Sequence, residues 1–216
     1  MQVFDPNQEY LVVERRLPHW SQAGTIAFIT LRTWDSMPEK VIRQWQDERS
    51  DWLRKHGIDP ARLDWEEQLR CQEAKLFREL QLVLSDRWNV HFDECHGACV
   101  LRRPDLAKEV ADSLLHFDQD RYDMTDFVVM PNHVHMLVAF ASADSQLAQC
   151  ESWKHFTAVK INKKLRQKRR FWQPDGFDHL VRSNEQFEYL RQYIADNPKK
   201  ANLQSGEYIV YSSRSA

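Results

Sequence analysis

The order of predicted elements indicates an α+β fold: a mostly antiparallel sheet with helices packed on one face, in a ferredoxin-like arrangement. Three observations predict it: a strand pattern near the N-terminus, two apolar runs joined by a tight Pro-Asn connection, and helical periodicity between and after them. The chain has 216 residues, enough to bury a sizeable core. We therefore predict one domain over 1–216, with extra N-terminal helices.

The N-terminal half predicts one strand and two helices. The run TIAFITLR at 25–32 is rich in β-branched and aromatic residues, which favour a strand. Apolar residues recur at helical spacing over 39–56 and again over 64–85, and these two helices form a predicted elaboration spanning 38–86. The short run ACVL at 98–101 is a further strand candidate.

The C-terminal half alternates helical and extended patterns. Pro131 and Asn132 suit a tight hairpin turn. Ser183 and Gln186 have capping-box spacing, so a helix is expected to begin at Ser183. In chain order these patterns predict helix 104–117, strands 123–130 and 133–140, helix 145–168, strand 177–182, helix 183–198 and a strand or tail at 207–212.

Composition favours a cytoplasmic protein without membrane contact. No window approaches the roughly 18 to 20 apolar residues of a bilayer span, and the start lacks the pattern of a signal peptide. The four cysteines are then expected to be reduced. Cys95 and Cys99 either hold zinc or supply two small buried residues entering a strand, and no second such pair follows.

The charge is distributed unevenly along the chain. Residues 1–150 carry 17 Lys and Arg against 25 Asp and Glu, whereas residues 151–216 carry 13 against 7. The run KINKKLRQKRR at 160–170 holds seven basic residues just before Phe171 and Trp172. The pattern suits the phosphates of a nucleic acid, with the aromatic rings stacking on unpaired bases, or else a solvated helix end. The candidate DNA-binding residues are Lys160, Lys163, Lys164, Arg169, Arg170, Lys199 and Lys200.

Two histidines on the predicted strand 133–140 are candidate metal ligands. Side chains alternate between the faces of a strand, so His133 and His135 are expected to project from the same face. Two neutral imidazoles side by side can hold one divalent ion. The alternative is a surface pair or a satisfied hydrogen-bond network.

A tyrosine and an asparagine on the last predicted helix are further candidates. Leu190 and Ile194 belong to the core-facing stripe, and Tyr193 and Asn197 lie about a quarter turn from it, where side chains can line a cleft. Pro198 disfavours helical geometry at Asn197, which predicts a helix end or a kink there. The alternative for the tyrosine is a packing residue with a solvated hydroxyl.

The four candidates together suit phosphodiester cleavage. A tyrosine hydroxyl is a poor nucleophile at neutral pH unless its target is activated or its proton is removed. A divalent ion held by His133, His135 and the Asn197 carbonyl oxygen would polarise a phosphate. Attack by Tyr193 would then give a phosphotyrosine and release a 3′ hydroxyl. Imidazole and amide-oxygen ligands suit Mg²⁺ or Mn²⁺, and the sequence does not choose between them.

Four separated runs carry a resemblance to a known family: FVVMPNHVHMLV, WKHFTAVKIN, FWQPDGFDHLVR and YIADNPKKANL. Together with RRLPHW and ITLRTWDSMP upstream, they cover most of the chain. The chain resembles the single-tyrosine HUH transposases, most closely the REP-associated tyrosine transposases. The resemblance implies a ferredoxin-like HUH fold and cleavage of hairpin-bearing single-stranded DNA through a 5′-phosphotyrosine with Mg²⁺ or Mn²⁺. It favours a monomer, and a dimer stays possible.

The resemblance also assigns roles to individual residues. His133 and His135 match the metal-binding histidines, Tyr193 the nucleophile, and Asn197 the polar helix residue that completes the metal site.

Two sequence features close to Tyr193 and Asn197 bear on this assignment. After Asn-Pro, the family's small-apolar then Gly pattern is replaced by Lys199 and Asn202, although Asn tolerates the left-handed conformation that Gly supplies. Tyr189 lies four residues before Tyr193, a spacing that two-tyrosine relatives use. The surrounding residues match the single-tyrosine pattern, so we predict a supporting or packing role for Tyr189.

Two other functions compete with a transposase. One is a domesticated protein that binds structured DNA without turnover, and the intact set of candidate residues argues against it. The other is a zinc-dependent hydrolase that uses the histidines with a cysteine, disfavoured because no acidic general base of the metalloprotease type accompanies the histidines.

Overall fold

The structure is a computed structural model of the chain. It describes all residues except 15–17, 37–38, 63–95, 175 and 215–216. The chain divides into two compact units, one formed by Met1–Ser36 with Ala98–Ala216 and the other by Met37–Gly97.

The second unit contains helix α1, Glu39–Lys55, which confirms the helix predicted at 39–56. The helix predicted at 64–85 lies outside the described residues. The predicted elaboration 38–86 falls inside this unit. A single domain over 1–216 stays a prediction.

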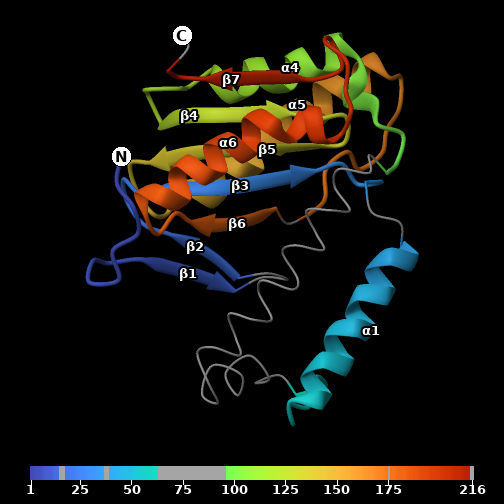
Figure 1. Cartoon of the computed structure of the whole chain (residues 1–216). Coiled ribbons are helices and arrows are strands. Elements are labelled where there is room, and N and C mark those ends of the chain that lie inside the picture. The colour runs from blue at the N-terminus through green and yellow to red at the C-terminus, as the bar shows by residue number, and fades with distance from the viewer. Residues whose placement is uncertain (15–17, 37–38, 63–95, 175, 215–216) are drawn as a thin grey trace. The chain divides into compact units, whose positions relative to one another are not determined.

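The first unit is built on a five-stranded antiparallel sheet with the strand order β6-β3-β5-β4-β7 (Figure 1). Its strands are β3 (Ile26–Arg32), β4 (Tyr122–Val129), β5 (His133–Phe140), β6 (Phe177–Leu180) and β7 (Ile209–Ser212). Helix α4 (Pro104–Leu115) connects β3 to β4, and α5 (Ser145–Lys164) connects β5 to β6. This β-α-β-β-α-β order is ferredoxin-like, so the predicted α+β class is confirmed.

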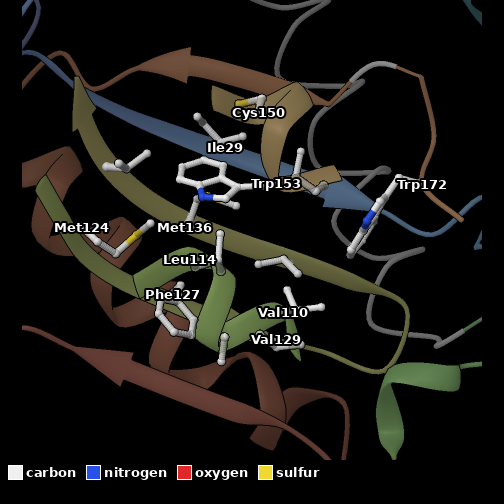
Figure 2. Packing of buried hydrophobic residues seen from close by; sticks show 14 of the residues in the cluster. Ile29, Val110, Leu114, Met124, Phe127, Val129, Met136, Cys150, Trp153 and Trp172 are labelled. Atoms are coloured by element: carbon white, nitrogen blue, oxygen red, sulfur yellow. The ribbon is translucent and has the colours of Figure 1, made fainter. Parts of the chain in front are cut away.

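Helices cover both faces of this sheet, and the prediction that they pack on one face is wrong. Side chains of α4 and α5 meet one face, where Val110, Trp153 and Met136 share a core (Figure 2). On the opposite face, Leu190 and Ile194 of α6 (Asn184–Lys200) form a second core with the strands. The reason is that β5 is buried along its whole length, so both of its faces need a cover.

Several local predictions differ from the structure. Residues 98–101 do not form a strand; the turn of 3-10 helix η1 (Val100–Arg102) begins after Cys99, whose φ of 48° is left-handed. Helix α5 ends at Lys164 instead of Lys168. Strands β1 (Leu11–Glu14) and β2 (Pro18–Ser21) pair in a small antiparallel sheet that was not predicted.

Cys99 is half-buried, and Cys95 lies outside the described residues. In the part of the chain that the structure describes, no helix has the length and apolar character needed to cross a membrane.

Candidate active site

The two candidate histidines lie at the beginning of the central strand β5 and share the face that α6 covers. Their Cα partners on β3 are Arg32 for His133 and Thr30 for His135. Both imidazoles are fully buried, and their ring centroids are 4.5 Å apart. The structure therefore brings the two rings together, as the alternation of strand side chains predicts.

Hydrogen bonds orient both rings through their Nδ1 atoms. His133 Nδ1 lies 2.7 Å from Asn132 Oδ1, and His135 Nδ1 lies 2.8 Å from Thr30 Oγ1. Because an amide oxygen only accepts, His133 donates its Nδ1 proton to Asn132. This leaves Nε2 as the atom of the His133 ring that can coordinate a cation, and the Thr30 contact favours the same atom of His135.

Burial keeps both imidazoles neutral. It lowers the pKa of His133 to about 3, with a smaller contribution from the Arg32 charge, and the nearby Asn197 side chain, which can accept a hydrogen bond from the charged ring, opposes the shift. The pKa of His135 is lowered well below its usual value by burial, by His133 and by Arg32. At neutral pH both rings are thus in the form that binds metals.

Helix α6 carries the candidate nucleophile to these histidines. The helix begins as predicted, because Ser183 Oγ accepts a hydrogen bond from the backbone N–H of Gln186 at 3.1 Å. Tyr193 packs with its ring centroid 5.3 Å from that of His135 and 6.1 Å from that of Phe28. The side chain is 8% exposed, so Tyr193 faces the sheet and not solvent.

Asn197 completes the group. It is fully buried, and its side chain lies close enough to His133 to oppose the lowering of that residue's pKa. The predicted helix end near Pro198 is early, since α6 continues to Lys200 with the buried Pro198 inside it. Asn202 then takes the left-handed conformation, with φ 52°, as expected for the residue at the glycine position.

These residues fit a divalent cation that keeps open positions. The candidate protein donors are the Nε2 atoms of the two imidazoles and the Asn197 amide oxygen, all of them buried. Within the described ranges there is no cluster of three or more His, Cys, Asp or Glu side chains suited to a metal. Such a small donor set leaves sites for water and phosphate oxygens, which suits Mg²⁺ or Mn²⁺. The cation itself stays a prediction.

Arg32 is a residue of the site that the sequence did not single out. It lies beside His133 on β3, only 3% exposed, and burial lowers its pKa to about 9, so it is charged at neutral pH. Its place opposite the histidines follows from strand pairing, for which the sequence carries no signal. A fixed positive charge at this point suits an anionic substrate.

The predicted basic residues lie in different environments. Lys160 and Lys164 at the end of α5 form ion pairs with Glu109 at 3.3 and 2.8 Å, which offsets part of their charge. Lys163 and Arg169 are exposed. The guanidinium of Arg170 lies 4.6 Å from the ring centroid of Trp34.

The prediction that Phe171 and Trp172 stack on DNA bases is wrong. Phe171 and Trp172 are buried in the core shared with α4 and α5, so their rings are not available to DNA. Trp34, 47% exposed and adjoining the end of β3, is the aromatic residue that Arg170 contacts. In the sequence, Trp34 could have been singled out by its position in the run ITLRTWDSMP, which carries part of the family resemblance.

Three further residues singled out in the sequence belong to α6. Lys200 Nζ is 4.9 Å from the centroid of the Tyr193 ring. Lys199 instead lines a surface groove with Ala195 and Asn202. Tyr189 is 67% exposed, which does not fit the packing role predicted for it.

Comparison with known proteins gives one match to a family model. Residues 102–197 match the family model described as "Transposase IS200 like", a range that contains all four candidate residues. A solved structure titled "Structure of the REP associates tyrosine transposase bound to a REP hairpin" aligns with 13% sequence identity and a TM-score of 0.45, covering 84% of this chain and 71% of that chain. No curated protein matches the chain.

Proposed function

We propose, from the premise that residues 102–197 match the IS200-like transposase family, that this protein cleaves and rejoins single-stranded, hairpin-bearing DNA through Tyr193. One observation carries the proposal: the Tyr193 ring packs on His135 while Asn197 from the same helix contacts His133. Residues with the chemistry of a nucleophile and of a cation site thus lie side by side, although they come from two elements far apart in the chain, β5 and α6.

The reaction is a transesterification. The phenolic oxygen of Tyr193 attacks the scissile phosphorus, a bond forms between them, and the bond to the 3′ oxygen breaks. The phenolic proton is lost and the departing 3′ oxygen takes up a proton, so no oxidant or reductant is needed. The 5′-phosphotyrosine conserves the energy of the diester bond, and attack by a 3′ hydroxyl reverses the step and rejoins DNA.

The chain supplies the surroundings for this step. His133, His135 and Asn197 would hold Mg²⁺ or Mn²⁺, which when bound polarises the phosphate. Asn132 and Thr30 keep the two imidazoles in place through hydrogen bonds of 2.7 and 2.8 Å. Such supporting hydrogen bonds reduce the reorganisation needed when substrate arrives.

The site is covered in this structure. His133, His135 and Asn197 have no exposed surface under α6. A phosphate therefore reaches the histidines only if α6 shifts relative to β5, and lids of this kind move in many enzymes on the microsecond to millisecond scale. The same burial favours the alternative, a DNA-binding protein without turnover, which makes a direct test of chemistry necessary.

The deciding experiment looks for a covalent protein–DNA species. Hairpin DNA with a single-stranded flank, labelled at its 3′ end, is incubated with the protein and Mn²⁺ and analysed under denaturing conditions. We expect a labelled band at the mass of the protein plus DNA, absent with Tyr193→Phe and with EDTA. Tyr189→Phe is the matched control, because it removes an exposed hydroxyl one turn away, and it should leave the band unchanged.

The possible results separate the two functions. Hairpin binding by the wild-type protein without any covalent band supports the alternative. A covalent band that persists in Tyr193→Phe would show that another residue is the nucleophile.

A further inference from the structure

Two adjacent lysines at the end of α6 lie in different surroundings. The Lys200 ammonium is 4.9 Å from the centroid of the Tyr193 ring. Lys199 lines a groove together with Ala195 and Asn202. Both lysines are exposed and both are in the last turn of the helix, so they interact alike with the helix dipole. They differ in which one contacts the candidate nucleophile.

The helix geometry explains this difference. Lys200 follows Tyr193 by seven residues, which is almost exactly two turns, so both side chains leave α6 on the same side. A residue one position earlier is rotated by about 100° and is directed elsewhere. Tyr193 is nearly buried whereas Lys200 is exposed, so Lys200 lies at the solvent side of the tyrosine.

A cation in this position can meet the phosphate that Tyr193 would attack. A phosphorus atom bonded to the Tyr193 oxygen would lie beside the ring, and the Lys200 ammonium, on a flexible four-carbon stem, is already 4.9 Å from the centroid of that ring. An ammonium group binds phosphate as a point charge with three donors. The contact with the aromatic face holds that charge near the reacting oxygen before DNA arrives.

We propose that Lys200 binds the scissile phosphate beside Tyr193, whereas Lys199 contributes only general attraction to DNA. The inference rests on the proposed function, because it names the part of the substrate that Lys200 recognises. It assigns different roles to Lys199 and Lys200, which the sequence places together as candidate DNA-binding residues. The competing role for Lys200 is to cover the Tyr193 ring, with no contact to substrate.

A binding cycle separates these roles without relying on turnover. The scissile linkage is first located from the covalent product of the wild-type protein. Binding is then measured in the Tyr193→Phe background, without divalent ions, to hairpin DNA with either a normal phosphodiester or a neutral methylphosphonate at that linkage. Lys200→Met and Lys199→Met are compared on both DNAs, and thermal unfolding confirms that each variant is folded.

We expect Lys200→Met to weaken binding to normal DNA roughly tenfold, the size of one charge-assisted contact. On the methylphosphonate DNA, Lys200→Met should have almost no effect, because its partner charge is already removed. Lys199→Met should weaken binding to both DNAs by the same factor. In the otherwise wild-type protein, Lys200→Arg should retain cleavage within about threefold, whereas Lys200→Met loses about tenfold at saturating DNA.

Equal effects of Lys200→Met on the two DNAs would overturn the inference and leave the proposed function intact. The same holds if Lys199→Met and Lys200→Met prove indistinguishable. A wild-type protein that forms no covalent product fails the proposed function itself, and the assignment of Lys200 fails with it.

Discussion

The ring of Tyr193 packs against the imidazole of His135 with centroids 5.3 Å apart, and this contact joins the last helix of the chain to the central strand of its sheet. Asn197, one turn further along α6, lies beside His133, two residues earlier on β5. The helix and the strand therefore meet through two matched pairs of side chains. Changes that loosen α6 or turn either imidazole should affect the site before they affect the rest of the fold.

Thr30→Val should impair the cation site without disturbing the sheet. The substitution keeps the shape of the side chain but removes the hydroxyl 2.8 Å from His135 Nδ1. Loss of such a supporting hydrogen bond costs about 10- to 100-fold in metal affinity. The measurement is Mn²⁺ titration of DNA cleavage. Thr125→Val is the control, since Thr125 is also buried but donates to the Leu137 carbonyl; equal losses in both variants would refute an orienting role for Thr30.

Arg191 should be needed to hold α6 on the sheet. It donates to both carboxylate oxygens of Asp126 at 2.8 and 3.2 Å and to Ser212 Oγ, so it ties the helix to β4 and β7. The pKa of Arg191 is raised mainly by its hydrogen bond to Asp126. Arg191→Met leaves the buried Asp126 carboxylate without this partner, and we expect a loss of about 3 kcal/mol in the free energy of unfolding by urea.

The exposed pair Arg214–Glu188 provides the comparison for Arg191. Arg214→Met should change the free energy of unfolding by less than about 0.5 kcal/mol, because surface ion pairs contribute little. Similar losses in the two variants would mean that the Arg191 contact is not specifically stabilising.

The buried histidines should make stability depend on pH. The pKa of His133 is about 3 in the folded protein, below the ordinary value of 6.5, and that of His135 is also lowered. Between about pH 6.5 and pH 3 the unfolded chain binds more protons than the folded chain. The contribution of the neutral histidines to the free energy of unfolding is therefore complete above about pH 6.5 and falls as the pH decreases toward 3. Urea unfolding without divalent ions, from pH 7.5 to 5, measures this slope.

His133→Gln tests the source of that slope. The variant should reduce it by up to about 1.4 kcal/mol per pH unit, the contribution of one proton. His155→Gln, which removes an exposed imidazole from α5, serves as the comparison. An unchanged slope in His133→Gln would assign the pH dependence to other groups.

The basic segment should contribute to DNA binding unequally along its length. Replacing Arg169 and Arg170 by Ala should flatten the dependence of log K on log salt by about 0.7 for each phosphate contact that is lost. Lys160→Ala should change the slope less, because Glu109 already pairs with that ammonium. Fluorescence titration of labelled single-stranded DNA at several salt concentrations gives the slopes. No change in the double variant would assign the run to a solvated helix end.

Local patterns were sufficient for much of the fold. The apolar strands, the hairpin at Pro131-Asn132 and the Ser183 cap are short-range features, and each appears in the structure within a few residues of its predicted bounds. The placement of His133 and His135 on one face also follows from local alternation. The 3-10 helix Val100–Arg102 was not predicted. It follows Cys99, whose backbone is left-handed, and no glycine at that position indicates such a conformation.

The sequence by itself determined the antiparallel α+β class, the paired histidines and the presence of a tyrosine and an asparagine one turn apart, because periodicity and turn chemistry act between near neighbours. Only the tertiary structure decided that α6 covers the face opposite α4 and α5, that Phe171 and Trp172 are buried, and that Arg32 lies beside His133. Those outcomes depend on which strands pair and which apolar surfaces must be covered. These outcomes are determined by contacts between residues that are distant in the chain, so no local sequence pattern predicts them.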